Sequence, residues 1–526
     1  MKLNMQKAVG IAGLVLICTI CLAISVGYYA VYGQHNLDSD ISSEFVLAQL
    51  LNDEGRMFLT NNWIYSTELR VVSPVPVYQL ALRLFNDWHV ARTVSIAVLL
   101  MGVMASIIYM LRGVCVSMRS ALVCAAVVVL PITPYNSFTL VYGGFYTVCV
   151  MLTFVEIGLV MRLGKIGGGG NCIVQALMLV ALSAYGGLNG VRMMMICNVP
   201  LLLASLITFY LDARLCERAS EILSLTSFKL FAASILCMAA TYIGYCINTN
   251  VFAQVYDFQQ YSETIIRPLN AEMFTDQIVS LMAYFGYRND AMLLSIEGIV
   301  SVFAMVLPIA GLAAIILLLC TKLEVRERLL AVFTITALLM GVLLNVLTLE
   351  NAQLPYSVSY YMPAAILLVY SLFWVFDRIE CRFVWMRMLP MLVLVGMFLA
   401  GNAVYRDKEF NTYNTELEEI AQILLDEAAY EGYATFWNAN VLTEITSGEL
   451  DVFSVEEWES GTINEWLQRK DHLDRKPWGR VFAIFRAQDW KEGDPGCDSE
   501  HLVYATDSFY VVVYDSDEEF RKVRGW

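Results

Sequence analysis

Residues 38–55 read DSDISSEFVLAQLLNDEG, and this stretch decides how the rest of the chain is interpreted. It follows an apolar run at residues 8–32 that is long enough to cross a membrane as a helix. Serine and aspartate are common helix N-caps, so we expect a short helix from Ser39 or Asp40 to about Asp53. The chain therefore places a polar helix start just beyond its first membrane span.

Three carboxylates gather at the start of this expected helix. Asp40 and Glu44 are four residues apart, which places both side chains over one side of the first turn, and Asp38 precedes them. A carboxylate at this position can act as a general base, or it can cap the helix. The pattern leaves both roles open.

A second helix is expected in the same loop, which we take as residues 33–90. After Pro74 and Pro76, apolar residues recur at the spacing of one helix face between Val77 and Phe85, with polar residues opposite. An amphipathic helix of this kind lies in the membrane interface rather than across the bilayer.

The composition defines the broad class of protein. The chain has 526 residues, of which 58% are hydrophobic and 16% charged, and such an apolar balance exceeds what one soluble core can bury. The net charge of −15 is carried by residues 406–526, while the preceding residues are balanced. An acidic tail argues against a nucleic-acid partner. No disulfide framework or zinc spacing emerges from the 13 cysteines.

About eleven apolar runs are predicted as transmembrane helices. They lie at about residues 8–32, 91–111, 120–138, 142–162, 172–187, 193–211, 229–248, 296–320, 329–348, 361–377 and 386–405. Basic residues are concentrated in the N-terminus and in every second loop between these runs. The positive-inside rule therefore places the N-terminus and those loops in the cytoplasm. We therefore predict a multi-pass plasma-membrane protein whose first loop and tail lie outside the cytoplasm.

Several arginines lie on the predicted outer side, where the positive-inside rule gives no reason for them. They are Arg70, Arg92, Arg192, Arg267 and Arg288. Arg192 follows a glycine-interrupted break at residues 185–190, and non-helical backbone at membrane depth normally lines a cavity. Guanidinium groups bind phosphate oxygens well, so these residues are candidates for an anion site.

The tail at residues 406–526 is predicted to be a small α/β domain. Helices are expected at 414–430 and 441–445, and strands at 433–436, 450–453, 480–485 and 509–514. The strand that leads into a helix at residues 433–440 is a type of place where ligands often bind. Trp437 and Asn438 there are candidates for holding a saccharide, or they belong to an ordinary domain core.

The first loop resembles that of the GT-C superfamily of membrane glycosyltransferases, in particular its protein-mannosyltransferase-like branch. The resemblance rests on an acidic residue after the first span, a small residue one turn on, a glycine at the helix end, prolines before a second helix and an arginine opening the second span. Those places are filled by Asp40, Glu44, Ala48, Gly55, Pro74, Pro76, Tyr78 and Arg92. The sequence departs from the commonest pattern, adjacent Asp-Glu, by having Asp38-Ser39-Asp40 with Glu44 a turn later.

The resemblance implies an inverting glycosyltransferase that takes a sugar from a polyprenyl-phosphate carrier. The acceptor would be an envelope glycan, lipid or protein on the outer face. Asp40 is the expected general base, with Asp38 as its nearest alternative and Glu44 in support. The donor phosphate is assigned to Arg92, Arg192, Arg70 and Arg288, and substrate contacts to His89, Asn189, Glu350 and Tyr356.

Two matters stay open in the sequence. Some members of the superfamily use a divalent metal ion such as Mg²⁺ or Mn²⁺ and others use none, and the first-loop carboxylates are candidate ligands. The alternative function is a transporter or flippase of lipid-linked sugars. We find no inverted repeat and no pair of broken helices in corresponding halves, which are typical of transporters.

Overall fold

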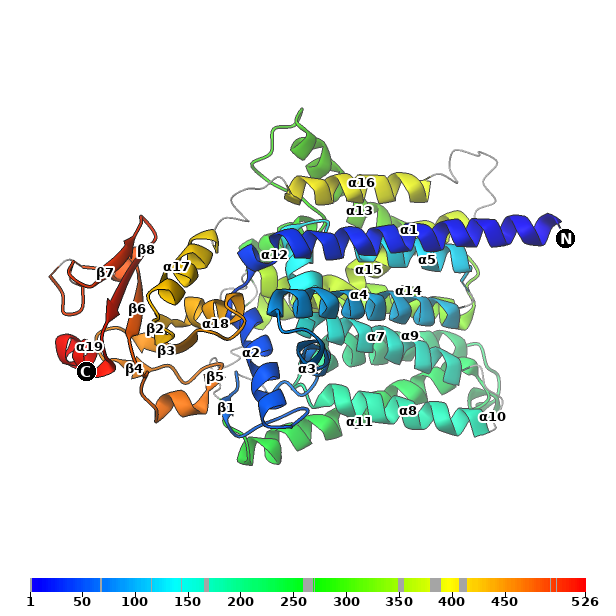
Figure 1. Cartoon of the computed structure of the whole chain (residues 1–526). Coiled ribbons are helices and arrows are strands. Elements are labelled where there is room, and N and C mark those ends of the chain that lie inside the picture. The colour runs from blue at the N-terminus through cyan, green and yellow to red at the C-terminus, as the bar shows by residue number, and fades with distance from the viewer. Residues whose placement is uncertain are drawn as a thin grey trace.

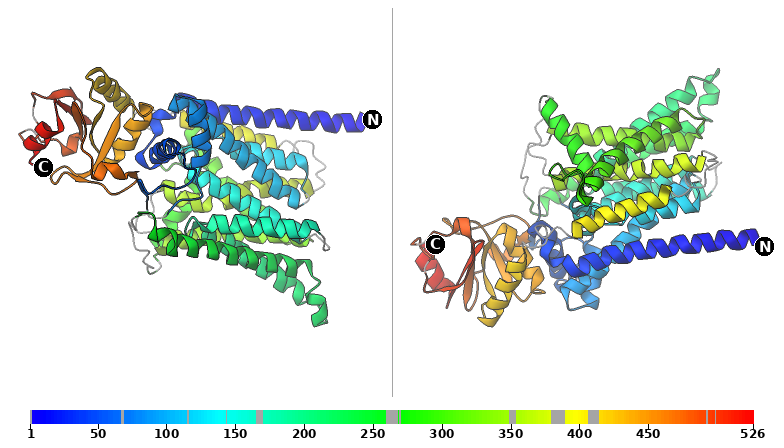
Figure 2. Two further views of the ribbon diagram at one scale, coloured as in Figure 1. Left: turned by 60° about the horizontal axis from the view of Figure 1, so that its bottom comes forward. Right: turned by 90° about the horizontal axis from the view of Figure 1, so that it is seen from above.

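The structure is a computed structural model that describes residues 2–66, 69–114, 116–142, 144–164, 170–258, 268, 270–348, 354–378, 389–405, 414–491, 493–497 and 499–526. It has two parts: a bundle of long helices, and an α/β domain at the end of the bundle opposite the N-terminus (Figure 1). The two further views in Figure 2 show the same arrangement.

Each apolar run of the sequence forms a helix of the bundle. These helices are α1 (Lys2–Tyr32), α4 (Trp88–Gly113), α5 (Met118–Val128), α7 (Gly144–Leu163), α8 (Gly170–Gly187), α9 (Val199–Ala213), α11 (Thr226–Asn250), α13 (Ile296–Leu319), α14 (Val325–Thr348), α15 (Leu354–Arg378) and α16 (Leu389–Tyr405). Shorter helical segments connect them, namely α6 (Pro134–Ser137), the π-helices η2 (Phe138–Tyr142) and η3 (Met194–Asn198), α10 (Ala219–Ile222), the 3₁₀ turn η4 (Phe252–Gln254) and α12 (Ala271–Tyr284).

Seven of these helical segments, within the described part of the chain, are long and apolar enough to cross a membrane. The prediction of a polytopic helical membrane domain is confirmed, but the count of about eleven spans is not. In the expected span at 120–138, α5 ends at Val128 and the next helix, α6, begins only at Pro134. The 11 residues of α5 extend about 17 Å, whereas the hydrocarbon core is about 30 Å thick. Pro131 follows shortly after, and proline lacks the N–H that a continuing helix needs.

Both helices expected in the first outer loop are present. Helix α2 (Ser39–Asp53) begins directly after Asp38, and α3 (Val75–Leu84) begins after Pro74. Gly55 follows the end of α2 with a φ of 67°, a left-handed conformation that glycine adopts without strain. The local predictions for this loop are therefore confirmed.

The C-terminal domain is a mixed α/β sheet with helices packed on it. Its elements are α17 (Thr415–Asp426), β2 (Glu431–Thr435), α18 (Phe436–Ile445), β3 (Asp451–Glu457), β4 (Thr462–Ile463), β5 (Gln468–Arg469), β6 (Val481–Arg486), β7 (Leu502–Ala505), β8 (Phe509–Tyr514) and α19 (Asp517–Arg524), with 3₁₀ turns at Lys470–Leu473 and Ala487–Asp489. The strand order of the main sheet is β4-β3-β2-β6-β8-β7. Strand β2 is parallel to both of its neighbours, and the other pairs are antiparallel.

The loop between α1 and α4 and the C-terminal domain are joined by backbone pairing. Strand β1 (Trp63–Ile64) of the loop pairs antiparallel with β5, so Trp63 lies opposite Arg469. The N–H of Lys470 donates to the carbonyl of Asn62 at 2.9 Å. Helix α18 packs against α2, which lies between the two parts in Figure 1. The domain is thus fixed on the loop that carries the three carboxylates.

Candidate active site

The three first-loop carboxylates lie at the start of α2, as the sequence predicted. Asp38 is the N-cap, and its Oδ1 accepts the N–H of Ile41 at 2.8 Å. Asp40 lies in the first helical turn, and Glu44 lies a turn later with 8% of its surface exposed. The capping role is therefore filled by Asp38, and Asp40 lies inside the helix.

Burial and mutual repulsion change the acidity of this group. Burial, with the neighbouring Asp40 charge, raises the pKa of Asp38 to about 7. Burial also raises the pKa of Glu44 to about 7, although the positive charges of Arg70 and Arg92 act in the opposite direction. Carboxyls of this kind change their charge near neutral pH rather than near pH 4.

Arg70 faces Glu44 across a small cavity between α2 and the chain that follows β1. Ser43, Glu44, Ser66 and Arg70 line it together with Trp63 and other apolar side chains. One Glu44 oxygen, Oε1, is buried and has no hydrogen-bond partner among the described residues. The cavity therefore combines an acid, a cation and hydroxyl groups.

Arg192 joins Arg70 at the aromatic residues that begin α7. The guanidinium carbon of Arg70 lies 4.6 Å from the centre of the Phe145 ring, and that of Arg192 lies 5.3 Å from the same ring. Arg192 also contacts the rings of Tyr146 and Tyr360. Asp40, Arg70 and Arg192 all lie within electrostatic range of the Tyr146 hydroxyl. The structure thus brings together one aspartate and two arginines that are far apart in the sequence.

Arg92, a predicted phosphate ligand, pairs with a carboxylate of the C-terminal domain. It has no exposed surface, and its Nη2 donates to Glu444 Oε2 at 2.8 Å while its Nε contacts the other oxygen of that carboxylate. It also donates to the carbonyl of Ile41 and lies over the rings of Phe45 and Tyr78. Two of its three nitrogens are therefore engaged, and we assign Arg92 to the junction of the loop and the C-terminal domain.

The remaining predicted contacts are dispersed. His89 stacks on Tyr29 at 5.6 Å, and one of its ring nitrogens lies 2.9 Å from the carbonyl of Ala30. Asn189 is buried, and its amide lies 3.6 Å from the sulfur of Cys149. Arg288 pairs with Asp290 at 3.0 Å where both side chains are exposed. None of these three contacts joins the Asp40 group, so we leave these residues out of the proposed site.

Three candidates cannot be placed. Glu350 and Arg267 lie outside the described residues, and for Tyr356 only its position in α15 is described. Four residues that the sequence analysis did not single out now belong to the site or its support, namely Glu444, Phe145, Tyr146 and Tyr360. Their roles arise from long-range contacts, which leave no local pattern.

The first-loop carboxylates do not form an all-protein metal site. Within the described ranges, no three His, Cys, Asp or Glu side chains are grouped so that they could hold a metal ion. Asp38 already accepts a backbone N–H, and Glu44 faces Arg70 across its cavity. The described side chains alone therefore do not complete a site for the Mg²⁺ or Mn²⁺ that the sequence left open.

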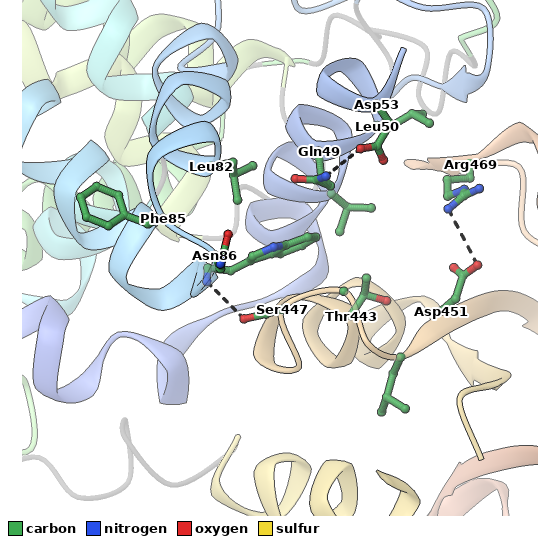
Figure 3. Close-up of a pocket in the computed structure, with 14 residues that line it drawn as sticks. Gln49, Leu50, Asp53, Leu82, Phe85, Asn86, Thr443, Ser447, Asp451 and Arg469 are labelled. Carbon is green, nitrogen blue, oxygen red and sulfur yellow. Dashed lines mark hydrogen bonds and ion pairs between the residues drawn. The ribbon is translucent and has the colours of Figure 1, made fainter. Parts of the chain in front are cut away.

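A groove of about 420 Å³ lies between α2 and the C-terminal domain (Figure 3). Gln49 and Asp53 line it from α2, and Asp451 and Arg469 line it from the domain. Gln49 donates to Asp53 at 2.8 Å, and Arg469 lies 3.9 Å from Asp451. Both parts of the protein thus contribute polar side chains to one open groove beside the carboxylate helix.

The fold is shared with solved structures of ArnT and of an oligosaccharyltransferase, in agreement with the fold that the resemblance of the first loop implied. The crystal structure of ArnT from Cupriavidus metallidurans bound to undecaprenyl phosphate has a TM-score of 0.57 and 12% identity, and the match covers 95% of this chain and 98% of that one. The archaeal oligosaccharyltransferase AglB from Archaeoglobus fulgidus, in complex with an inhibitory peptide and a dolichol-phosphate, has a TM-score of 0.51 and 10% identity, covering 90% and 69%.

A third structure is the oligosaccharyltransferase of Archaeoglobus fulgidus in complex with Zn and sulfate, with a TM-score of 0.50, 10% identity and coverage of 90% and 68%. At these identities the comparison shows a shared fold. Comparison of the sequence with protein-family models and with curated proteins finds no match.

Proposed function

We propose that this protein is an inverting glycosyltransferase that moves a sugar from a polyprenyl phosphate to an acceptor hydroxyl at the outer face of the plasma membrane. The observation that carries the proposal is that Arg70 and Arg192 meet at the Phe145 ring, close enough to Asp40 that all three charges act on Tyr146. Similarity of fold to proteins whose structures contain undecaprenyl phosphate or dolichol-phosphate supports the choice of donor.

The chemistry uses a base and two cations. Asp40 accepts the proton of the acceptor hydroxyl while that oxygen forms a bond to the anomeric carbon of the sugar. The bond from that carbon to the phosphate oxygen breaks, and the lipid phosphate leaves with the electron pair. Arg70 and Arg192 stabilise the negative charge that develops on the leaving phosphate.

The neighbouring groups have supporting roles in this proposal. Glu44 lines one cavity with Arg70, and we assign to its charge the role of orienting that guanidinium toward the donor phosphate. Asp38 caps α2 and so fixes the first turn that carries Asp40. The groove beside α2 is our candidate for the acceptor because it is open and is lined by polar side chains. The N-terminus is assigned to the cytoplasm by the distribution of basic residues.

The test is transfer of radiolabelled sugar from a panel of polyprenyl-phosphate sugars by membranes that contain wild-type protein or a variant. We expect wild-type membranes to transfer from at least one donor and Asp40→Asn membranes to lose at least about 100-fold in rate. Asp38→Asn should retain most activity, because asparagine is also a good N-cap.

Asp87→Asn is the matched control. Asp87 caps α4 in the same loop, with its Oδ1 accepting the N–H of Val90 at 3.1 Å, and it lies outside the proposed site. Its activity should equal that of the wild type. Transfer from no donor, or full activity of Asp40→Asn at normal expression, would overturn the catalytic proposal and favour a transporter of lipid-linked sugars.

A further inference from the structure

A second cavity lies in the C-terminal domain at the edge of its sheet where three parallel strands end. Strands β3, β2 and β6 are neighbours, and their carboxyl ends are Glu457, Thr435 and Arg486. All three residues line the cavity, whose volume is about 490 Å³. Ligands in α/β sheets commonly bind outside the carboxyl ends of parallel strands, in pockets of about 300–1,000 Å³.

Two residues that line this cavity each carry a buried polar atom that has no partner among the described residues. Thr435 is 8% exposed and is the N-cap of α18, yet its hydroxyl caps nothing and has no hydrogen-bond partner in the described part of the chain. Trp458 is 5% exposed, and its indole Nε1 likewise has no partner there. Buried polar groups are nearly always hydrogen-bonded, so these two mark a place for an acceptor atom.

Two of the three cations that line the cavity, Arg486 and Arg524, are engaged by other groups, and the third is Lys491. Arg486 donates from Nε to Asp489 at 2.8 Å, and Arg524 donates to the backbone carbonyls of Pro495 and Trp458. The rim carries an excess of carboxylates, which opposes an anionic ligand. These are Glu456, Glu457, Glu459, Asp489 and Asp494.

The ligand must therefore accept hydrogen bonds from Thr435 and Trp458 and donate hydrogen bonds to the carboxylates of the rim. A hydroxyl group does both, because its oxygen accepts while its hydrogen is donated. Several hydroxyls on one small ring are the defining feature of a sugar. Trp437 and Asn438, which the sequence suggested as saccharide contacts, begin α18 beside this cavity, but Thr435 lines it instead.

We propose that the cavity at the carboxyl ends of β2, β3 and β6 binds a neutral saccharide unit. The hydroxyl of Thr435 and the indole N–H of Trp458 donate to its oxygens, and carboxylates such as Glu457 accept from its hydroxyls. This site lies in the C-terminal domain and needs no glycosyl transfer at Asp40. A binding test of this proposal is therefore independent of the proposed function.

The test is binding to the full chain in detergent micelles, measured by saturation-transfer NMR. The neutral probes are the methyl glycosides of glucose, galactose and mannose, and the anionic probes are glucuronate and inorganic phosphate. We expect saturation transfer to at least one neutral glycoside and none to phosphate. Thr435→Val keeps the branched shape but removes the hydroxyl, and Glu457→Gln removes a rim charge, so each should weaken binding about tenfold.

Asp515→Asn is the matched control, because Asp515 is exposed and lies just beyond the end of β8, at the opposite edge of the sheet. It should bind the glycoside as the wild type does. Absence of transfer to every neutral glycoside, binding of phosphate or glucuronate alone, or equal binding by Thr435→Val and Glu457→Gln would each overturn the proposal.

Discussion

Arg92 on α4 and Glu444 on α18 form a buried, two-point ion pair that joins the membrane domain to the C-terminal domain. Arg92 has no exposed surface and the Glu444 side chain is 3% exposed, so both charges are removed from water. The same guanidinium donates to the backbone of α2 and lies over rings from α2 and α3. One side chain thus contacts α2, α3 and the C-terminal domain together.

The first prediction concerns the energy of this pair. Removing one partner leaves a buried charge without its counterion, which costs about 3–5 kcal/mol, whereas removing both does not. We expect Glu444→Leu alone to lower the free energy of unfolding by that amount and Arg92→Leu with Glu444→Leu to restore much of it. The free energies are measured by denaturant titration of the full chain in micelles.

A surface pair provides the control for this cycle. Arg480 and Glu427 lie 2.8 Å apart, but each side chain is 40% exposed, so their coupling should stay below about 1 kcal/mol. If the Arg92–Glu444 cycle gave a coupling energy as small as this one, the pair would not fix the two domains together.

The second prediction concerns the two arginines at Phe145. Arg70→Gln and Arg192→Gln should each reduce kcat/KM for sugar transfer by about 10²–10³, because each removes a cation from the leaving phosphate. The lysine variants should recover part of the loss, since the charge returns without the planar fork. Arg83→Gln is the control, because Arg83 is exposed on α3 and bonds only to Asn52 among the described residues. Equal activity of all five variants would remove the arginines from the proposed mechanism.

Local patterns in the sequence predicted the elements that hold the site, but not the contacts that assemble it. Helix α2 followed from its cap, its apolar spacing and Gly55, which are all within one short stretch. Strand β1 was not predicted, because two residues show no periodicity and its partner β5 lies in the other domain. The role of Glu444 was also missed. An acidic residue on a short helix of the tail is normally at the surface, and its partner Arg92 is far away in the sequence.

The third prediction follows from the acidity of Glu44. Its pKa is raised from 4.5 to about 7 by burial, so between these values the folded protein binds a proton that the unfolded chain has lost. The free energy of unfolding therefore falls as pH rises through this window, and Asp38 acts in the same direction. Glu44→Gln, which resembles the protonated acid, should raise Tm more at pH 8 than at pH 5.

The matched comparison for this pH effect is Glu449→Gln, which changes an exposed glutamate of the C-terminal domain. Its Tm should follow that of the wild type at both pH values. A Tm difference between Glu44→Gln and the wild type that is the same at pH 5 and pH 8 would show that Glu44 does not hold its proton more tightly in the folded state.

The last prediction concerns the contact between α8 and α11, which supports the break that leads to Arg192. A Cβ atom added at Gly244 would lie 2.0 Å from the backbone oxygen of Ala184, and one at Gly187 would lie 2.0 Å from that of Thr241. Small residues allow helix backbones in a membrane to approach this closely. Gly244→Ala should therefore force the helices apart and lower Tm by several degrees.

Gly13→Ala on α1 is the control. A Cβ atom added there meets nothing within 4 Å, so this variant should leave Tm unchanged or raise it slightly, as alanine favours a helix. If Gly244→Ala left Tm unchanged, as Gly13→Ala should, the close contact between α8 and α11 at Gly244 would be contradicted.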